Sequence, residues 1–129
     1  MEKTNFVNLR VYKLSERLAD QTWKIVIRWD NLAKDTVGKQ LVRAADSIGA
    51  NVAEGSGRGT EPEIRRFLRI ARGSLYETKH WLRRAYKRKL LTDKQVNDLL
   101  PIVGELTPKL NAYLRSIGSF KKRGSAIGI

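Results

Sequence analysis

The sequence predicts an all-α protein that folds as an antiparallel up-and-down four-helix bundle. Three observations predict it. Apolar residues recur every three or four positions through four segments, the connections between these segments are short, and no segment alternates as a strand does. A length of 129 residues corresponds to one domain. We expect residues 1–117 to form the bundle and residues 118–129 to form a flexible basic tail.

The first helix is predicted over residues 7–29. Its apolar residues, among them Leu14 and Leu18, are spaced three, four or seven apart and share one face. A second apolar row on this segment, which includes Trp23 and Ile27, makes the apolar surface wider than one core needs. The second row therefore indicates self-association.

The second and third helices are bounded by capping signals. Asp35 is the predicted N-cap of the second helix, which ends in the glycine-rich run at residues 55–59. Thr60 and Glu63 have the spacing of a capping box, and Pro62 suits the first turn of the third helix. The third helix then carries a core row that alternates by three and four residues.

The fourth helix is predicted to open with a capping box formed by Thr92 and Gln95. Pro101 and Pro108 each remove one backbone hydrogen bond from it, which favours a bend. The apolar period from Val96 to Ile117 crosses both prolines without a change of phase. We therefore predict one kinked helix.

The charge is strongly basic and unevenly distributed. The chain has 26 Lys and Arg against 13 Asp and Glu, a net charge of +13, and residues 60–91 hold ten of the bases but only three of the acids. Arginine forks match phosphate oxygens, so this segment favours binding of a nucleic-acid backbone. A solvated or oligomer-pairing face is the alternative. The predicted nucleic-acid-binding residues are Arg58, Arg65, Arg66, Arg69, Arg72, Lys79, Arg83, Arg84, Lys87, Arg88, Lys89, Lys121, Lys122 and Arg123.

Several function classes are not expected. The absence of cysteine and the presence of one histidine argue against a metal site, a redox cofactor or a thiolate nucleophile. His80 has no obvious catalytic partner, and Glu61 and Glu63 have a use in helix capping, so no catalytic residues are predicted. No apolar run resembles a signal peptide or a membrane span, so we expect a cytoplasmic protein that uses no membrane.

Five polar residues on the second and third helices are predicted to have structural roles. Arg43, Ser47 and Glu54 lie along one side of the second helix, and Ser74 and Glu77 share one side of the third. We expect a buried pair of Arg43 with Glu77 or with Glu54 to tie the two helices together.

Two segments of the sequence carry a family resemblance. The runs QLVRAADSIGANVAEGSGR (residues 40–58) and FLRIARGSLYETKHWL (residues 67–82) closely resemble the bundle proteins encoded within intervening sequences of bacterial 23S rRNA genes. The resemblance implies a homopentamer that is thought to bind nucleic acid and has no known enzymatic activity. A related branch comprises accessory proteins of diversity-generating retroelements, which bind a reverse transcriptase with its template RNA.

The sequence as a whole thus predicts a non-enzymatic, oligomeric nucleic-acid-binding bundle, with RNA preferred on the grounds of the resemblance. It would bind phosphates by shape and charge. The alternative is a protein-interaction scaffold that docks an acidic partner such as a reverse transcriptase.

Overall fold

The computed structural model describes the backbone of residues 6–127 and the side chains of residues 9–117. Within this range the chain is helical and contains no strand. The elements in chain order are α1 (Phe6–Val26), α2 (Asn31–Ala33), the π-helix η1 (Lys34–Gly38), α3 (Lys39–Ser56), α4 (Glu61–Lys87) and α5 (Asp93–Ile127). Because α2, η1 and α3 follow one another without a break, the fold consists of four rods.

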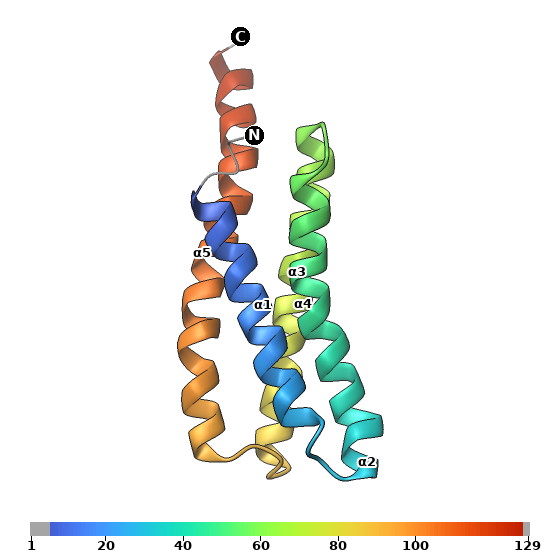
Figure 1. Cartoon of the computed structure of the whole chain (residues 1–129). Coiled ribbons are helices and arrows are strands. Elements are labelled where there is room, and N and C mark those ends of the chain that lie inside the picture. Colours follow the sequence, from blue (N-terminus) through green and yellow to red (C-terminus); the bar gives the residue numbers. More distant parts are fainter. Residues whose placement is uncertain (1–5, 128–129) are drawn as a thin grey trace.

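The rods are arranged as a square in cross-section. Both α1 and α4 pack on α3, and both also pack on α5. Successive rods run in opposite directions, as Figure 1 shows. The predicted antiparallel up-and-down four-helix bundle is confirmed, and its α1/α3 face lies opposite its α4/α5 face.

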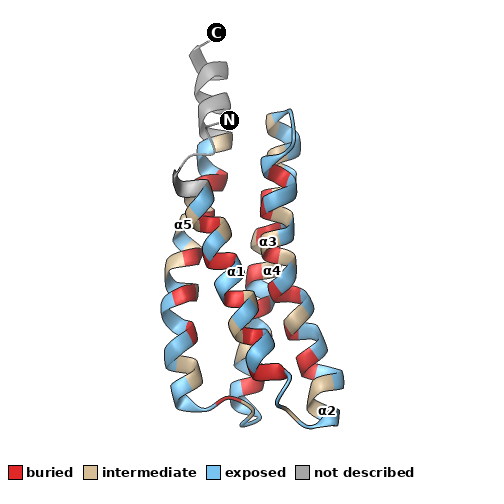
Figure 2. Ribbon diagram, viewed as in Figure 1, coloured by how far each residue is buried: buried red, intermediate tan, exposed pale blue. Residues whose placement is uncertain are grey.

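The core is formed by one apolar row from each rod, and these buried residues face the bundle interior in Figure 2. Leu14, Leu41, Leu68 and Leu106 represent the four rods, and each is fully buried. Each of the four predicted core rows contributes to this core, whereas Trp23 and Ile27 of the second apolar row on α1 are exposed. The burial of these rows fixes how each helix is rotated about its own axis.

Three hydroxyl side chains lie within this core, and each satisfies its own hydrogen bond. Ser15 donates to the carbonyl of Val11 at 2.8 Å, and Thr22 donates to the carbonyl of Leu18 at 2.7 Å. Thr78 makes the same contact with the residue one turn before it. Because the donors find backbone carbonyls on their own helices, these residues can be buried without a partner from another helix.

The ends of α4 have the predicted start and a well-defined stop. The N–H of Glu63 donates to the Thr60 hydroxyl at 3.4 Å, which confirms the start. At the other end Lys89 has a φ of 63°, and the Leu90 N–H donates to the carbonyl of Ala85 at 2.8 Å. This is the Schellman arrangement, with lysine at the left-handed position that glycine usually holds.

The capping box that opens α5 is complete. The Thr92 N–H donates to the Gln95 side chain at 2.9 Å, and the Gln95 N–H donates to the Thr92 hydroxyl at 3.1 Å. As predicted, α5 is one helix that contains both Pro101 and Pro108.

The end of α5 differs from the predicted domain boundary. The backbone stays helical past residue 117 and ends at Ile127. Gly118 and Gly124 are weak helix formers, but no proline follows Pro108, and lysine and arginine favour the helix, so the backbone can continue through this stretch. The side chains of Lys121, Lys122 and Arg123 lie outside the described residues.

The start of the second rod also differs, because Asp35 is not its N-cap. Asp30 caps it instead, and its carboxylate accepts a hydrogen bond from the Ala33 N–H at 3.1 Å. Asp35 lies within η1. Asp30 and Asp35 are both of a residue type that caps helices, and the helical backbone that starts at Asn31 continues through the wider π-turns of η1 into α3, which leaves Asp35 inside the rod.

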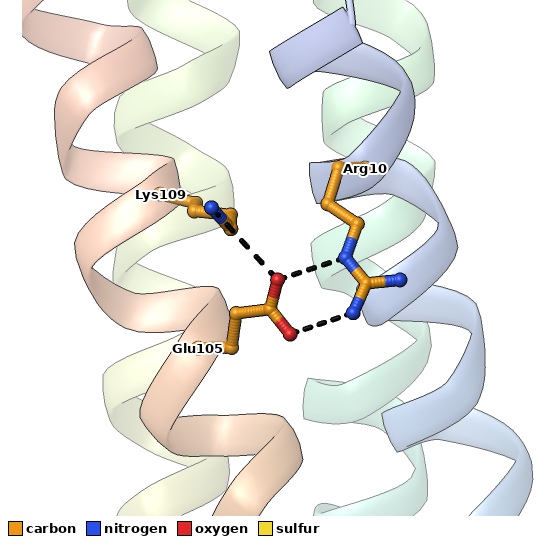
Figure 3. A network of polar contacts seen from close by, with 3 residues as sticks. All are labelled: Arg10, Glu105 and Lys109. Atoms are coloured by element: carbon orange, nitrogen blue, oxygen red, sulfur yellow. Dashed lines mark hydrogen bonds and ion pairs between the residues drawn. The ribbon is translucent and has the colours of Figure 1, made fainter.

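One ion-pair network links the first and last rods (Figure 3). The Arg10 guanidinium donates to both carboxylate oxygens of Glu105, at 2.8 and 2.6 Å, and the Lys109 ammonium lies 3.8 Å from the same carboxylate. The hydrogen bonds from Arg10, followed by the charges of Arg10, Lys109 and Arg17, lower the pKa of Glu105. The ionised form of Glu105 is therefore stabilised in the folded state.

This network makes a pH-dependent contribution to stability. A carboxylate with a lowered pKa stabilises the fold above its unfolded pKa of about 4.3, and the contribution is lost as the pH falls through the folded value. We expect Glu105→Gln to reduce the free energy of unfolding at neutral pH and to flatten its decline in acid. Urea titrations of both proteins at several pH values test this, and parallel pH curves would contradict it.

Two glycines provide a matched test of packing. A Cβ on Gly38 would lie 2.7 Å from Val26 Cγ1 and 3.1 Å from the Ala33 carbonyl, whereas a Cβ on Gly73 would meet nothing within 4 Å. We expect Gly38→Ala to lower the free energy of unfolding by about 1–3 kcal/mol, and Gly73→Ala to raise it by about 1 kcal/mol. Chemical denaturation measures both, and equal effects would refute the packing difference.

Candidate nucleic-acid interface

The predicted binding residues lie mainly on α4, whose rotation is fixed by its core row. Leu68, Ala71 and Leu75 are buried in this row. At 100° per residue, the bases at other positions must then lie on the flanks and the outer side of the helix. The flank on which they gather decides which face of the bundle is basic.

Six of the bases form a single row along the flank of α4 that faces α5. Arg72 donates to the Asn111 side chain of α5 at 3.5 Å, and Lys79 and Arg83 line a groove together with residues of α5. Along the helix the row covers 22 residues, or about 33 Å. We call these residues the basic stripe: Arg65, Arg69, Arg72, Lys79, Arg83 and Lys87.

The cations of the basic stripe are not neutralised within the described part of the chain. The ion pairs found there join Arg10 and Lys109 to Glu105, Arg58 to Glu54, and Lys94 to Asp98. None of them includes a stripe residue. The stripe is therefore a row of positive charges for which residues 9–117 provide no carboxylate within 4.0 Å.

The acids of α4 are few and lie mainly away from the stripe. Glu61 and Glu63 occupy the first turn, where the positive end of the helix dipole stabilises their charge, and Glu61 lies one turn before the first stripe residue. Glu77 lies on the other flank and accepts a hydrogen bond from the Trp81 indole at 3.3 Å. Beyond its first turn, the stripe is thus separated from the acids of its own helix.

The structure does not bring all the predicted binding residues into this row. Arg66 and Arg84 lie on the outer side of α4, while Arg88 and Lys89 lie in its C-terminal turn. Arg58 precedes α4 and forms a short ion pair with Glu54. These five residues flank the stripe or lie beyond its ends.

Two exposed tyrosines accompany the stripe. Tyr76 lies midway along it, and the Lys79 ammonium lies 5.3 Å from the centre of its ring. Tyr86 lines the groove that the stripe cations share with α5. Trp81 lies on the other flank, beside Glu77. Tyr76 and Tyr86 are thus the aromatic residues positioned to stack on a base beside the stripe.

The C-terminal half of the stripe borders an apolar groove between α4 and α5, and the volume of this groove is about 450 Å³. Val96, Leu100 and Val103 of α5 form one wall, and Leu100 is 59% exposed. The apolar spacing of the sequence assigns Val96 and Val103 to the core row, but both are only partly buried and line the groove with Leu100, which the sequence does not single out. The signal for this wall is the spacing of four and three residues through these positions.

The predicted polar residues at the α3/α4 contact form a smaller network than expected. Ser74 donates to the Ser47 hydroxyl at 2.9 Å, and the Asn51 amide donates to the same hydroxyl at 3.0 Å. Asn51 was not among the predicted site residues. The three side chains link the two helices through neutral hydrogen bonds.

The expected buried pair of Arg43 with Glu77 or Glu54 is wrong. All three side chains are exposed, and Glu54 pairs instead with Arg58, four residues later on the same side of the chain. Solvated ions avoid the cost of removing two charges from water, which explains why the pair does not form in the interior.

The opposite face of the bundle carries a small acidic groove between α1 and α3. Glu16, Asp20 and Asp46 line this groove together with Gly49, and the volume of the groove is about 210 Å³. Burial, and then the charge of Asp20, raises the pKa of Asp46.

Within the described residues, no group of three His, Asp or Glu side chains is placed to hold a metal ion. No helix in this part of the chain is long and apolar enough to cross a membrane.

Comparison with known proteins places the fold. A crystal structure of a protein of unknown function from the S23 ribosomal protein family of Bacteroides thetaiotaomicron superposes with a TM-score of 0.70. The sequence identity is 21%, and the match covers 84% of this chain and 98% of that one. At this identity the likeness shows the fold. None of the functionally curated proteins matches the sequence.

A family match covers most of the bundle. Residues 7–112 match the family described as 23S rRNA-intervening sequence protein. The matched range includes all of the basic stripe and both segments that carry the resemblance noted in the sequence. The chain therefore belongs to the family of 23S rRNA-intervening sequence proteins.

Proposed function

We propose that the protein is a non-enzymatic nucleic-acid-binding protein that holds a phosphate backbone along the basic stripe. The observation that carries this proposal is the row of six cations without a carboxylate partner among the described residues. The family description refers to 23S rRNA, which favours RNA over DNA. The relationship to retroelement accessory proteins stays an expectation of the resemblance.

The spacing of the stripe suits phosphates. Its cations form two groups of three, spaced three or four residues apart, or about 5–6 Å along the helix, and Arg72 and Lys79 at the inner ends of the groups are seven residues apart. The whole row of about 33 Å is as long as one turn of a nucleic-acid duplex. Arginine, which supplies four of the six cations, can contact two phosphate oxygens at once. Affinity would come from counterion release, with little reading of base sequence.

The proposal includes assembly into a homo-oligomer, which the family resemblance suggests is a pentamer. Trp23 and Ile27 on α1 are 54% and 48% exposed, and they line a second groove of about 430 Å³ together with Val42 of α3. Burying these side chains against another copy would remove apolar surface from water. Several stripes in one particle would also bind a long polyanion with higher avidity.

Charge reversal of the stripe tests the binding site. We expect Arg65, Arg69, Arg83 and Lys87 changed together to Glu to weaken binding of fluorescein-labelled poly(U) by at least about 100-fold, and to lower the salt slope of this single strand by about three. Fluorescence anisotropy at several salt concentrations measures both. The helical circular dichroism spectrum should be unchanged, because none of the four side chains belongs to the core.

A control with the same change in net charge distinguishes the stripe from a general effect of charge. Lys13, Lys24 and Arg28 are exposed on α1 or the turn after it, and Lys94 is exposed in the first turn of α5; none of the four belongs to the stripe or lines its groove. Their reversal to Glu should weaken poly(U) binding far less than reversal of the stripe. Equal losses in the two variants would mean that net charge, and not the stripe, determines binding.

The assembly has its own test. We expect Trp23→Glu to convert the oligomer into single chains of 14.7 kDa, because the new charge would be buried at the contact. Light scattering coupled to size exclusion measures the mass. Leu100→Asp, on the opposite face, serves as the control and should leave the mass unchanged. A wild-type mass of one chain would overturn this part of the proposal.

A further inference from the structure

The apolar groove between α4 and α5 has one cationic edge and one apolar edge, and phosphate binding explains only the cationic one. One edge is cationic, because Lys79, Arg83 and Lys87 follow one another at four-residue intervals along α4. The other edge is apolar and is formed by Val96, Leu100 and Val103 of α5. Both edges run along the bundle for about 10–12 Å.

The apolar edge is exposed although no packing within the bundle requires it to be. Leu100 is 59% exposed although Leu99 and Ile102, its neighbours in the chain, are buried in the core. Tyr86, which also lines the groove, is 48% exposed. A large apolar side chain beside a depression of about 450 Å³ is typical of a surface that another molecule covers.

We infer that this groove docks an amphipathic α-helix of a partner protein, with an apolar row against α5 and a row of carboxylates against the cations of α4. A helix with Glu or Asp at i, i+4 and i+8 presents carboxylates at the same interval as the three cations. Its apolar residues, three and four positions apart, match the interval of the α5 edge. The complement to both edges is an acidic helix of about three turns.

The groove favours a helix over an extended peptide. Its walls are side chains of two helices, whose backbone groups are already hydrogen-bonded within α4 and α5. An extended peptide would find no strand edge to pair with and would bury its own backbone groups without partners. A helix satisfies those groups itself.

The groove also favours a protein over the other candidate occupants. A nucleic-acid strand whose phosphates lie on the cations of α4 would bring charged groups beside the apolar edge, which offers them no hydrogen-bond partner. A second copy of this chain is disfavoured because the apolar surface proposed above for self-association, at Trp23 and Ile27, lies between α1 and α3 on the opposite face. The complement to the cationic edge is therefore an acidic helix of a different protein.

This inference does not depend on nucleic-acid binding by the stripe. Leu100 lies on α5, outside the stripe, and changing it removes no cation. Arg65, Arg69 and Arg72 lie in the N-terminal half of α4 and do not line the groove. Either activity could therefore fail in an experiment while the other persists.

The test uses the full chain and a labelled synthetic peptide. The probe is a helical peptide with Leu at i, i+3, i+4 and i+7 and Glu along one flank, and the comparison peptide has the same composition in an order that destroys the apolar row. Fluorescence anisotropy should show that the ordered peptide binds at least about tenfold more tightly. Leu100→Asn, which removes the apolar side chain without adding a charge, should remove this advantage, and Arg83→Gln should weaken binding severalfold.

Matched controls place the contact. Arg66→Gln removes a cation from the outer side of α4 and should leave peptide binding unchanged. In the unaltered protein, the peptide should shift the methyl NMR signals of Val96, Leu100 and Val103 but not that of Ile27 on the opposite face. The methyl readout needs no variant, so it holds even if a substitution disturbs folding.

Three results would overturn the inference. Equal affinity for the two peptides would show simple charge attraction. A change in particle mass with Leu100→Asp would make the groove a contact between copies. Loss of poly(U) binding with the uncharged Leu100→Asn would make the groove part of the nucleic-acid site, whereas unchanged poly(U) binding beside lost peptide binding supports a separate protein-docking groove.

Discussion

Burial of the apolar row of α4 is the constraint on which the arrangement of charge depends. Leu68, Leu75 and Ala85 are at the bundle centre, so the helix cannot turn without exposing them. Its cations must then stay in water, because burying an unpaired charge costs several kcal/mol. The apolar row that stabilises the bundle and the cations of the basic stripe thereby lie on two sides of one helix. The packing that stabilises the bundle also holds the basic stripe straight.

Local chemistry explains which parts of the fold the sequence predicts well. The capping boxes at Thr60 and Thr92 depend on contacts within four residues, so their spacing alone specifies them. The N-cap at Asp30 was missed for a structural reason. Asp30 and Asp35 are both of a residue type that caps helices, and no local signal in the sequence announces that five residues of π-helix after α2 continue the rod into α3.

The candidate site could be predicted in composition but not in placement. The sequence locates ten bases in residues 60–91, yet which of them form one row facing α5 depends on the order of the rods around the core. The Arg43 pair was wrong for a related reason. Residues on corresponding sides of two helices need not face each other, because their rotation is set by the core rows and not by charge. The apolar wall of α5 that includes Leu100 was readable in the spacing, but the same spacing assigns Val96 and Val103 to the core row.

The two faces of the bundle have different electrostatic roles. The α1/α3 face contains a groove where burial, and then the neighbouring charge of Asp20, raises the pKa of Asp46. The α4/α5 face carries the basic stripe, and its cations have no carboxylate partner among the described residues. A polyanion that approaches this bundle is therefore steered toward the α4/α5 face. Because the apolar groove opens on that same face, an acidic helix would be drawn to it by the same field. The apolar edge would then decide between the two, since phosphates gain nothing from contact with Leu100 whereas an amphipathic helix does.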